Sequence, residues 1–253
     1  MNALLSSLPL LATGPETGTV SSKYRFVSSG DAVRNITEKT GWQPYRTIEQ
    51  KRGKIGSGRH IVLFRHPNYP GNETGIPQIA LLNSHNGSSS FRLMLSMHVL
   101  ACSNGLFLAT GTLTDYRIRH IGNSVLSNVE AAINGLTAQL PETLNLIRRM
   151  QSTPVSPNEA LAFAEFGAQL RGIKTAQPAT FFAGRVAESQ TAPTVWNIFN
   201  RVQEKLIRGG FVYSVVNQDT GNVRRLTARK IGGITATVKV NTALWAEALK
   251  LAA

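Results

Sequence analysis

A turn at Asn86-Gly87 constrains this chain more than any other short segment. It stands between two apolar runs in the stretch IALLNSHNGSSSFRLMLSMHVLACSNGLFLATG, residues 79–111. Asn and Gly both tolerate positive φ, and this pair between alternating apolar residues is the strongest short-range signal for a two-residue β-hairpin. The segment therefore predicts two antiparallel strands joined at residues 86 and 87.

Further segments with the character of strands lie around this hairpin, with Gly or Asn between them. Their apolar runs and turn residues predict an antiparallel meander. Residues 211–218 predict one more strand, and a polar basic segment follows it at residues 222–230. A hairpin is predicted at residues 43–51 and 59–66, and the strands of the meander that follows are predicted at residues 76–83, 91–102, 105–111 and 115–122.

Helical periodicity begins at Ser124, from which apolar residues recur about one turn apart as far as Leu140. Pro141 predicts a kink or a division of this long helix. An earlier helix is predicted to start at Asp31 and to stop at Gly41. Further helices are predicted at residues 156–172, 191–210 and 241–253. The predicted fold class is α+β: an antiparallel β-meander followed by a long helix, with additional C-terminal helices and a short strand region.

The length of the chain limits the size of its core, and its charge indicates the kind of partner. A chain of 253 residues can bury a full core, and we expect a mobile N-terminal arm at residues 1–22 and a single α+β domain at residues 23–253. The 27 Lys and Arg against 14 Asp and Glu give a net charge of +13, which favours a polyanion or an acidic partner. The opening apolar run lacks the basic start and the cleavage site of a signal peptide, and no later run reaches the length of a membrane span. A cytoplasmic protein without membrane association is therefore expected.

The histidines and the single cysteine do not predict an enzyme. None of the five histidines has metal-ligand spacing, and between residues 74 and 129 the only carboxylate is that of Asp115, where a two-metal nuclease would need several. Cys102 with His85 or His98 could form a nucleophile and base, but Cys102 ends an apolar run and suits a small buried side chain better. The segment GKIGSG, residues 53–58, lacks the spacing of a phosphate-binding loop. No catalytic residue, metal or cofactor is predicted.

Basic residues recur along the predicted strands. Alternation would place Arg117 and Arg119 on one strand face, where two neighbouring cations suit a phosphate backbone. The alternative is an ordinary solvated basic face, and at a net charge of +13 we favour nucleic acid. The predicted nucleic-acid contacts are Lys51, Arg52, Lys54, Arg59, Arg65, Arg92, Arg117, Arg119, Arg224 and Arg225.

Several motifs give the chain a resemblance to a known family. They are NSHNGSSSFRL, CSNGL and RIRHIG, preceded by PYR and HIVLFRH and followed by WNIFNRVQEKLIRGG. Over residues 24–215 the chain resembles the phage- and plasmid-like proteins of domain-of-unknown-function family 932. The resemblance implies a phage, prophage or plasmid setting and no assigned activity. Asn86 departs from the family, in which Asp is more frequent, and this weakens a catalytic role for that position.

The first of these motifs makes the turn more than an arbitrary hairpin. Two interpretations stay open. The side chains could form a buried polar cluster that satisfies backbone groups and ties the hairpin to the CSNG segment, or they could contact a ligand. The matching residues are Asn83, Ser84, His85, Gly87 and Ser88, with Cys102 and Asn104 in the second motif.

Two functions from different classes are compatible with these observations. A strand meander followed by a long helix is similar to the core of the single-strand annealing superfamily, which includes the recombination mediators and phage Red beta; this is an analogy of fold. Such proteins form rings or filaments and anneal without a cofactor. The predicted function is therefore single-stranded DNA binding and annealing in recombination by a homo-oligomer, with RNA and duplex DNA left open as ligands. The alternative is a structural or inhibitory protein that binds an acidic protein or nucleoprotein partner.

Overall fold

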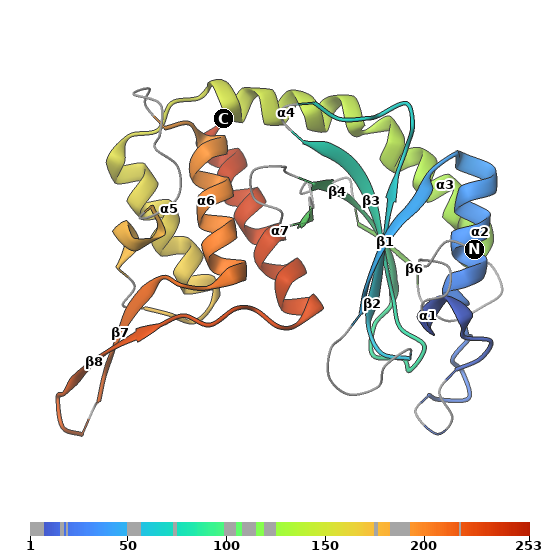
Figure 1. Cartoon of the computed structure of the whole chain (residues 1–253), viewed down its shortest axis with the longest axis horizontal. Helices are drawn as coiled ribbons and strands as arrows, with labels where there is room; N and C mark the ends of the chain where they lie inside the picture. The colour runs from blue at the N-terminus through green and yellow to red at the C-terminus, as the bar shows by residue number, and fades with distance from the viewer. Residues whose placement is uncertain are drawn as a thin grey trace. The chain divides into compact units, whose positions relative to one another are not determined.

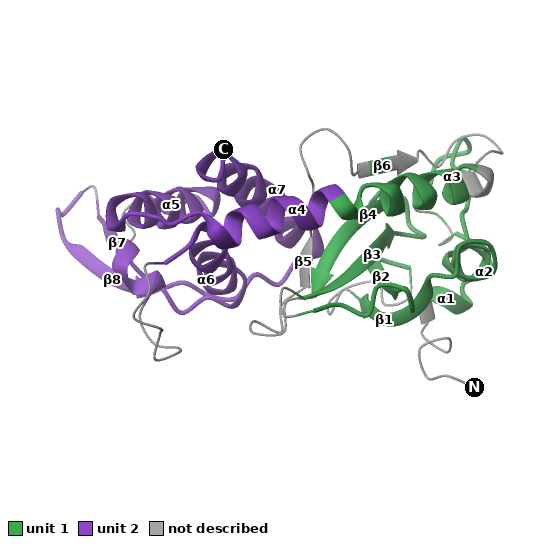
Figure 2. Ribbon diagram, turned by 90° about the horizontal axis from the view of Figure 1, so that it is seen from above, with its two compact units in different colours: residues 1–141 green, residues 142–253 purple. Residues whose placement is uncertain are grey.

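The chain forms two compact units, which we call unit 1 (Met1–Pro141) and unit 2 (Glu142–Ala253) (Figure 2). In the computed structural model the described residues are 8–15, 18, 20–49, 57–72, 75–98, 105–107, 115–118, 125–174, 177–182, 193–217 and 219–253. Within the predicted N-terminal arm, Leu8–Leu11 form the short helix α1, and Leu10 is buried. The mobility of residues 1–22 stays a prediction.

An antiparallel sheet forms the centre of unit 1 (Figure 1). Its strands follow the order β1-β2-β3-β4-β5, and β6 also pairs with β4. Side chains on both faces of β2, β3 and β4 are buried, which explains why these strands are nearly continuous apolar runs. The predicted meander is confirmed, with strands β1 (Gln43–Glu49), β2 (His60–Arg65), β3 (Ile76–Asn83), β4 (Phe91–His98), β5 (Gly105–Phe107) and β6 (Asp115–Ile118).

Helices α2 (Ser29–Thr40) and α3 (Val125–Ala138) cover one face of this sheet. The ring nitrogen of Trp42 donates a 3.1 Å hydrogen bond to the hydroxyl of Thr137 on α3. Gly135 leaves room for Tyr116 of β6, since a Cβ there would lie 2.4 Å from the tyrosine oxygen. By register, His60 shares this helix-covered face with Val62 and Phe64 on β2.

Unit 2 is helical, with a small two-stranded sheet. Its elements are α4 (Leu140–Ser152, which begins at the end of unit 1), α5 (Pro157–Leu170), the 3-10 helix η1 (Pro178–Phe181), α6 (Val195–Arg208), β7 (Val212–Val216), β8 (Val223–Thr227) and α7 (Ile234–Leu251). Ser156 caps α5 in a reciprocal arrangement with Glu159. The core contains Phe199 and Trp245 in edge-to-face contact. The predicted α+β class is confirmed, and the predicted long helix is divided at Gln139, next to Pro141.

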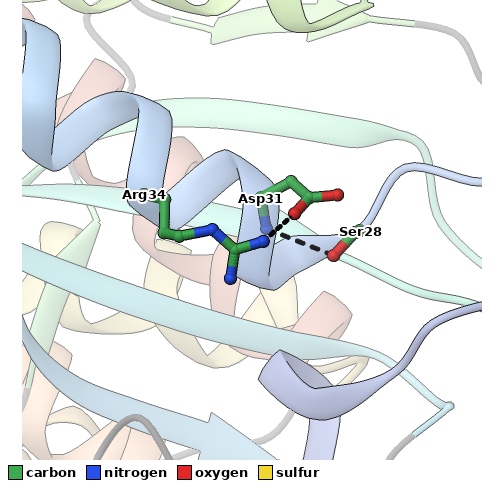
Figure 3. A network of polar contacts seen from close by, with 3 residues as sticks. All are labelled: Ser28, Asp31 and Arg34. Carbon is green, nitrogen blue, oxygen red and sulfur yellow. Dashed lines mark hydrogen bonds and ion pairs between the residues drawn. The ribbon is translucent and has the colours of Figure 1, made fainter.

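The predicted N-cap of the first long helix is wrong by three residues. Ser28, and not Asp31, is the N-cap, because the Ser28 hydroxyl accepts a 3.2 Å hydrogen bond from the backbone N–H of Asp31 (Figure 3). Asp31 lies in the first turn, where its carboxylate favours the helix dipole and pairs with Arg34. The stop at Gly41 is confirmed by its positive φ.

The hairpin at Asn86-Gly87 is confirmed, but its predicted two-residue turn is wrong. Strands β3 and β4 are joined by residues 84–90. The Ser84 hydroxyl accepts a 2.8 Å bond from the N–H of Ser89 and so closes a longer loop, in which Gly87 has a φ of 71°. Side-chain bonds to the backbone therefore set the loop length in place of a tight turn.

Two predictions for the C-terminal region also need correction. Part of the polar basic segment at residues 222–230 is strand β8, which pairs in register with β7. The final helix begins at Ile234, seven residues before the predicted start at Asn241. Among the described residues, no helix is both long and apolar enough to cross a membrane.

Candidate nucleic-acid interface

The first candidate surface is built around an irregularity in β1. Pro44 pairs with Phe64 and Arg46 with Leu63, so Tyr45 is an extra residue in a β-bulge. The Tyr45 side chain is 47% exposed, and the guanidinium carbon of Arg65 lies 3.4 Å from the centre of its ring. The bulge therefore presents an aromatic ring next to a cation on the surface of unit 1.

The side chains of Arg46 and His98 lie close to that of Arg65. Burial lowers the pKa of the His98 imidazole, and the positive charges of Arg65 and Arg46 lower it further. By register, these three residues share the sheet face opposite the helices. The Nε–H of Arg65 is buried and has no hydrogen-bond partner in the described part of the chain. We call Tyr45, Arg46, Arg65 and His98 the Arg65 cluster; its local positive potential and its open donor suit an anion.

A second pair of basic residues lies at the other end of β4. Register places Arg92 of β4 directly opposite Arg117 of β6. Arg92 and His98 are six residues apart, about 20 Å along an extended strand. The buried side chain of Met94 lies between them. Arg92 and the Arg65 cluster therefore occupy separate ends of this sheet face.

The other basic residues predicted for this surface are less informative. The Arg59 guanidinium donates to the carbonyl of Ser88 at 2.9 Å, which gives it a structural role beside the hairpin loop. The predicted shared face of Arg117 and Arg119 stays a prediction. Lys51, Arg52, Lys54 and Arg119 lie outside the described residues.

The motif at the β3–β4 loop contributes to a buried group that we call the polar cluster: Ser29, His60, Asn83 and His85. None of these four residues is exposed to solvent. The Ser29 hydroxyl lies 2.7 Å from Nε2 of His60 and 3.1 Å from Nε2 of His85. The Asn83 amide donates to the same hydroxyl at 2.8 Å and to the carbonyl of Val27 at 3.1 Å. The cluster thus ties the end of β3 and the start of β2 to the first turn of α2.

The single hydroxyl proton of Ser29 determines which nitrogen of each imidazole donates. Nδ1 of His60 lies 2.9 Å from the carbonyl of Gly58 and must donate to it, so its Nε2 accepts the Ser29 proton when the ring is neutral. His85 must then donate from Nε2 to the Ser29 oxygen. Burial lowers the pKa of His60 to about 4, against a smaller raising effect of the Gly58 bond, and this keeps His60 neutral at pH 7.

The remaining residues of the motif hold the loop itself. The Ser84 carbonyl accepts from the Tyr24 hydroxyl at 3.1 Å, and the Ser88 N–H donates to the side chain of Asn86 at 3.1 Å. These bonds fit the interpretation of a buried polar cluster that satisfies backbone groups. They run to α2 and the segment before it, while Cys102 and Asn104 lie outside the described residues. Contact with a ligand stays a hypothesis.

Arg224 and Arg225, the last of the predicted contacts, lie in unit 2 on β8. Both are exposed. They point to opposite faces of the strand, since Arg224 pairs with Val215 and Arg225 with Ser214. The Arg225 guanidinium donates to the side chain of Gln177 at 3.1 Å.

The predicted site residues do not include Tyr45, Arg46, Ser29 or His60. Pro44 inside a predicted strand is a signal for a bulge, and it could have drawn attention to Tyr45. Ser29 and His60 carry no local signal, because their roles arise only when segments 31 residues apart meet. In the described part of the chain, no group of three or more His, Cys, Asp or Glu side chains is placed to hold a metal ion.

Comparison with known proteins places the chain in a family of unknown function. The model of the family described as "Domain of unknown function (DUF932)" matches residues 16–245. The chain is 29% identical over 238 residues to the UPF0380 protein YafZ of Escherichia coli (strain K12), which covers 90% of this chain and 83% of that protein. It is 28% identical over 232 residues to the UPF0380 protein YfjQ of the same strain, with coverage of 89% and 81%. No solved structure matches the chain.

Proposed function

The chain belongs to the DUF932 family, whose description assigns no activity, and from its surface chemistry we propose that it binds single-stranded DNA. The observation that carries the proposal is the Arg65 cluster. Arg46 and Arg65 have no ion-pair partner among the described residues, and both lower the pKa of His98. A phosphate would stabilise this site, because its negative charge offsets the repulsion between the arginines and its oxygens can accept from the Nε–H of Arg65.

Tyr45 favours a single strand over a duplex as the ligand. A base whose partner is absent can stack on an exposed aromatic ring, and such stacking contributes about 1–3 kcal/mol per base. Tyr45 is half-exposed and stands beside the two arginines. Phosphates would contact the guanidinium groups while one base lies on the ring. This mode of binding requires no sequence preference.

The wider setting of this activity rests on the resemblance drawn from the motifs. The protein would act for a phage or another mobile element in the cytoplasm of a bacterial host, in annealing during recombination, as a ring or filament of identical chains. The antiparallel sheet followed by α3 and α4 supports this proposal as an analogy of fold. RNA and duplex DNA are further ligands to be compared.

The test is fluorescence anisotropy with a labelled 20-nucleotide oligo-dT at several salt concentrations. The parent protein should bind, and Arg46→Ala with Arg65→Ala should weaken binding at least about tenfold at low salt. The slope of log affinity against log salt should fall by about 1.4, because each lost phosphate contact on a single strand removes about 0.7. Tyr45→Ala should weaken binding with little change in slope, since it removes stacking and no charge.

The matched control removes two exposed cations elsewhere, by Arg148→Ala with Lys174→Ala, and should change affinity less than twofold. Melting curves must show that each variant is folded. A folded Arg46/Arg65 variant with parental affinity and slope would overturn the assignment of the site. If the parent binds no nucleic acid but is captured by an acidic protein, the alternative function as an interaction protein replaces the proposal.

A further inference from the structure

Strands β7 and β8, with the turn at residues 217–222, form a two-stranded ribbon that reaches away from the helices of unit 2 (Figure 1). Both of its faces are open to solvent near the turn. Val216 and Val223 form a cross-strand pair on one face and are 43% and 64% exposed, and Val215 on the other face is 44% exposed. Large apolar side chains on both faces of an isolated two-stranded ribbon indicate an interaction surface.

The base of the ribbon is held rigidly, in contrast to this exposed end. Phe211 is buried and stacks on Phe181 with ring centres 4.4 Å apart. The N–H of Val212 donates to the Thr180 hydroxyl at 3.2 Å. The Arg171 guanidinium donates to the carbonyl of Arg229 at 2.6 Å and so fixes the chain that leaves the ribbon. The ribbon is therefore a supported arm.

Hydrogen bonds also hold the described residues of this turn, which are 217 and 219–222. The side chain of Asn217 accepts bonds from the N–H groups of Asp219 and Thr220 at 2.8 and 3.0 Å. Gly221 has a φ of 67°, which suits the turn, and its N–H donates to the carbonyl of Asn217 at 2.9 Å. An arm with a defined end can enter a groove at a lower cost in entropy than a mobile loop.

The charge of the ribbon selects the partner. Between residues 212 and 230 the only acidic residue is Asp219. Arg224 is exposed, and its guanidinium has no hydrogen-bond or ion-pair partner among the residues that the structure describes. The ribbon of a second copy would carry the same excess of arginine, so like charges disfavour the pairing of two ribbons. The basic residues of the segment are Arg224, Arg225, Arg229 and Lys230.

We propose that the ribbon enters a groove of duplex DNA. The major groove admits a two-stranded β-ribbon, with arginines directed to phosphates or base edges and apolar side chains to thymine methyl groups. The exposed valines offer apolar contact but no aromatic ring for stacking, which favours a duplex over a single strand. The inference rests on the proposed nucleic-acid function but names a second substrate class and a separate surface in unit 2.

The experiment compares a labelled 20-base-pair duplex with the labelled 20-nucleotide oligo-dT by anisotropy. Arg224→Ala with Arg225→Ala should weaken duplex binding at least about tenfold and reduce its salt slope by about 1.8, at about 0.9 for each lost contact to a duplex. Oligo-dT affinity should stay within twofold. The Arg148→Ala and Lys174→Ala control removes the same charge from exposed positions and should leave both affinities within twofold.

A second variant keeps the strands but removes the apolar contact. Threonine has a high strand propensity, so Val216→Thr with Val223→Thr should melt close to the parent temperature. It should weaken duplex binding about threefold with the salt slope unchanged. Parental duplex affinity in this variant and in the folded arginine variant would overturn the proposal, and so would competition by polyglutamate as effective as that by unlabelled duplex.

The parent protein separates the two proposals. Binding to oligo-dT but not to duplex would overturn the ribbon inference and leave the proposed single-strand function standing. Binding to duplex alone, lost in the ribbon variants, would support the ribbon and overturn the proposed function. Equal losses of duplex and oligo-dT affinity in the ribbon variants would overturn the assignment of the ribbon to a duplex.

Discussion

The sheet of unit 1 and the ribbon of unit 2 are both antiparallel, yet they hold their residues in opposite environments. Strands β2, β3 and β4 are buried on both faces, and the end of that sheet is held by the polar cluster. The outer part of the ribbon is exposed on both faces, and ring stacking at its base holds it to the helices of unit 2. The comparison teaches that residues of the buried strands stabilise the fold, whereas residues of the exposed strands are free to bind a partner.

The largest expected effect tests the buried side of this comparison. Asn83→Ala removes the amide that donates to Ser29 and Val27 and the oxygen that accepts from the N–H of Ser84 at 2.8 Å. Several buried polar groups would lose a partner, at about 1–3 kcal/mol each, so the free energy of unfolding should fall by about 4 kcal/mol. Urea denaturation followed by circular dichroism measures the change.

Asn222→Ala in the turn of the ribbon is the matched control. This side chain is exposed, and its loss should change stability by less than about 0.5 kcal/mol. Equal losses for the two asparagines would break the comparison, because the polar cluster would then contribute no more than a surface turn.

The second prediction concerns acid. His60 has a pKa of about 4 in the folded chain, against 6.5 as its ordinary value, and burial is the main cause. The unfolded chain therefore binds more protons between pH 6.5 and pH 4. Stability should be complete above pH 6.5, should fall through this window by about 3 kcal/mol, and should level off below pH 4. Urea midpoints across the window, with an NMR titration of the His60 ring, measure the effect.

All five histidines belong to unit 1, which sharpens this test. Hydrogen exchange at pH 5, corrected for the intrinsic rate, should accelerate in β2, β3 and α2 and much less in α5, α6 and α7. Equal acceleration in both units would show that they unfold as one body. A His60 ring that titrates near 6.5 would contradict the prediction itself.

The third and smallest effect tests the base of the ribbon. Gly209 has a φ of 80°, and a Cβ there would lie 2.4 Å from the carbonyl oxygen of Ala228. Gly209→Ala should therefore cost about 2 kcal/mol and speed hydrogen exchange in β7 and β8. Gly210→Ala is the matched control, because Gly210 also has a positive φ but has no atom within 4 Å of the added carbon. Equal costs for the two substitutions would show that close packing at Gly209 is unimportant.

Much of the fold could be predicted from local patterns. The strands up to β4 and the helices with clear start and stop residues follow from apolar periodicity, Ser caps and glycine. The length of the β3–β4 loop could not, because the bond between Ser84 and Ser89 competes with a tight Asn-Gly turn. The start of α2 was missed because Ser28 and Asp31 are both good capping residues, and backbone geometry chooses between them.

Single residues of the candidate surfaces could be predicted from the sequence, but their proximity to one another could not. Arg65 was named from the basic composition of its strand, but its stacking on Tyr45 depends on a bulge, and its proximity to His98 depends on the register of three strands. The ribbon was predicted only in part, since the alternation of residues 222–230 is weak where both faces are exposed. Alternation of apolar and polar residues predicts a strand only where one of its faces is buried.

The shared hydroxyl of Ser29 has a consequence for how this sequence can change over evolution. Replacement of Ser29 removes the shared partner of the other three residues, and replacement of any of those three leaves Ser29 with one bond fewer. The effect of a substitution in the polar cluster therefore depends on which residues occupy its other positions. An apolar replacement becomes acceptable only when the residues that it contacts have changed as well. Positions 29, 60, 83 and 85 should accordingly diverge as a set among relatives, while the tip of the ribbon can change one residue at a time.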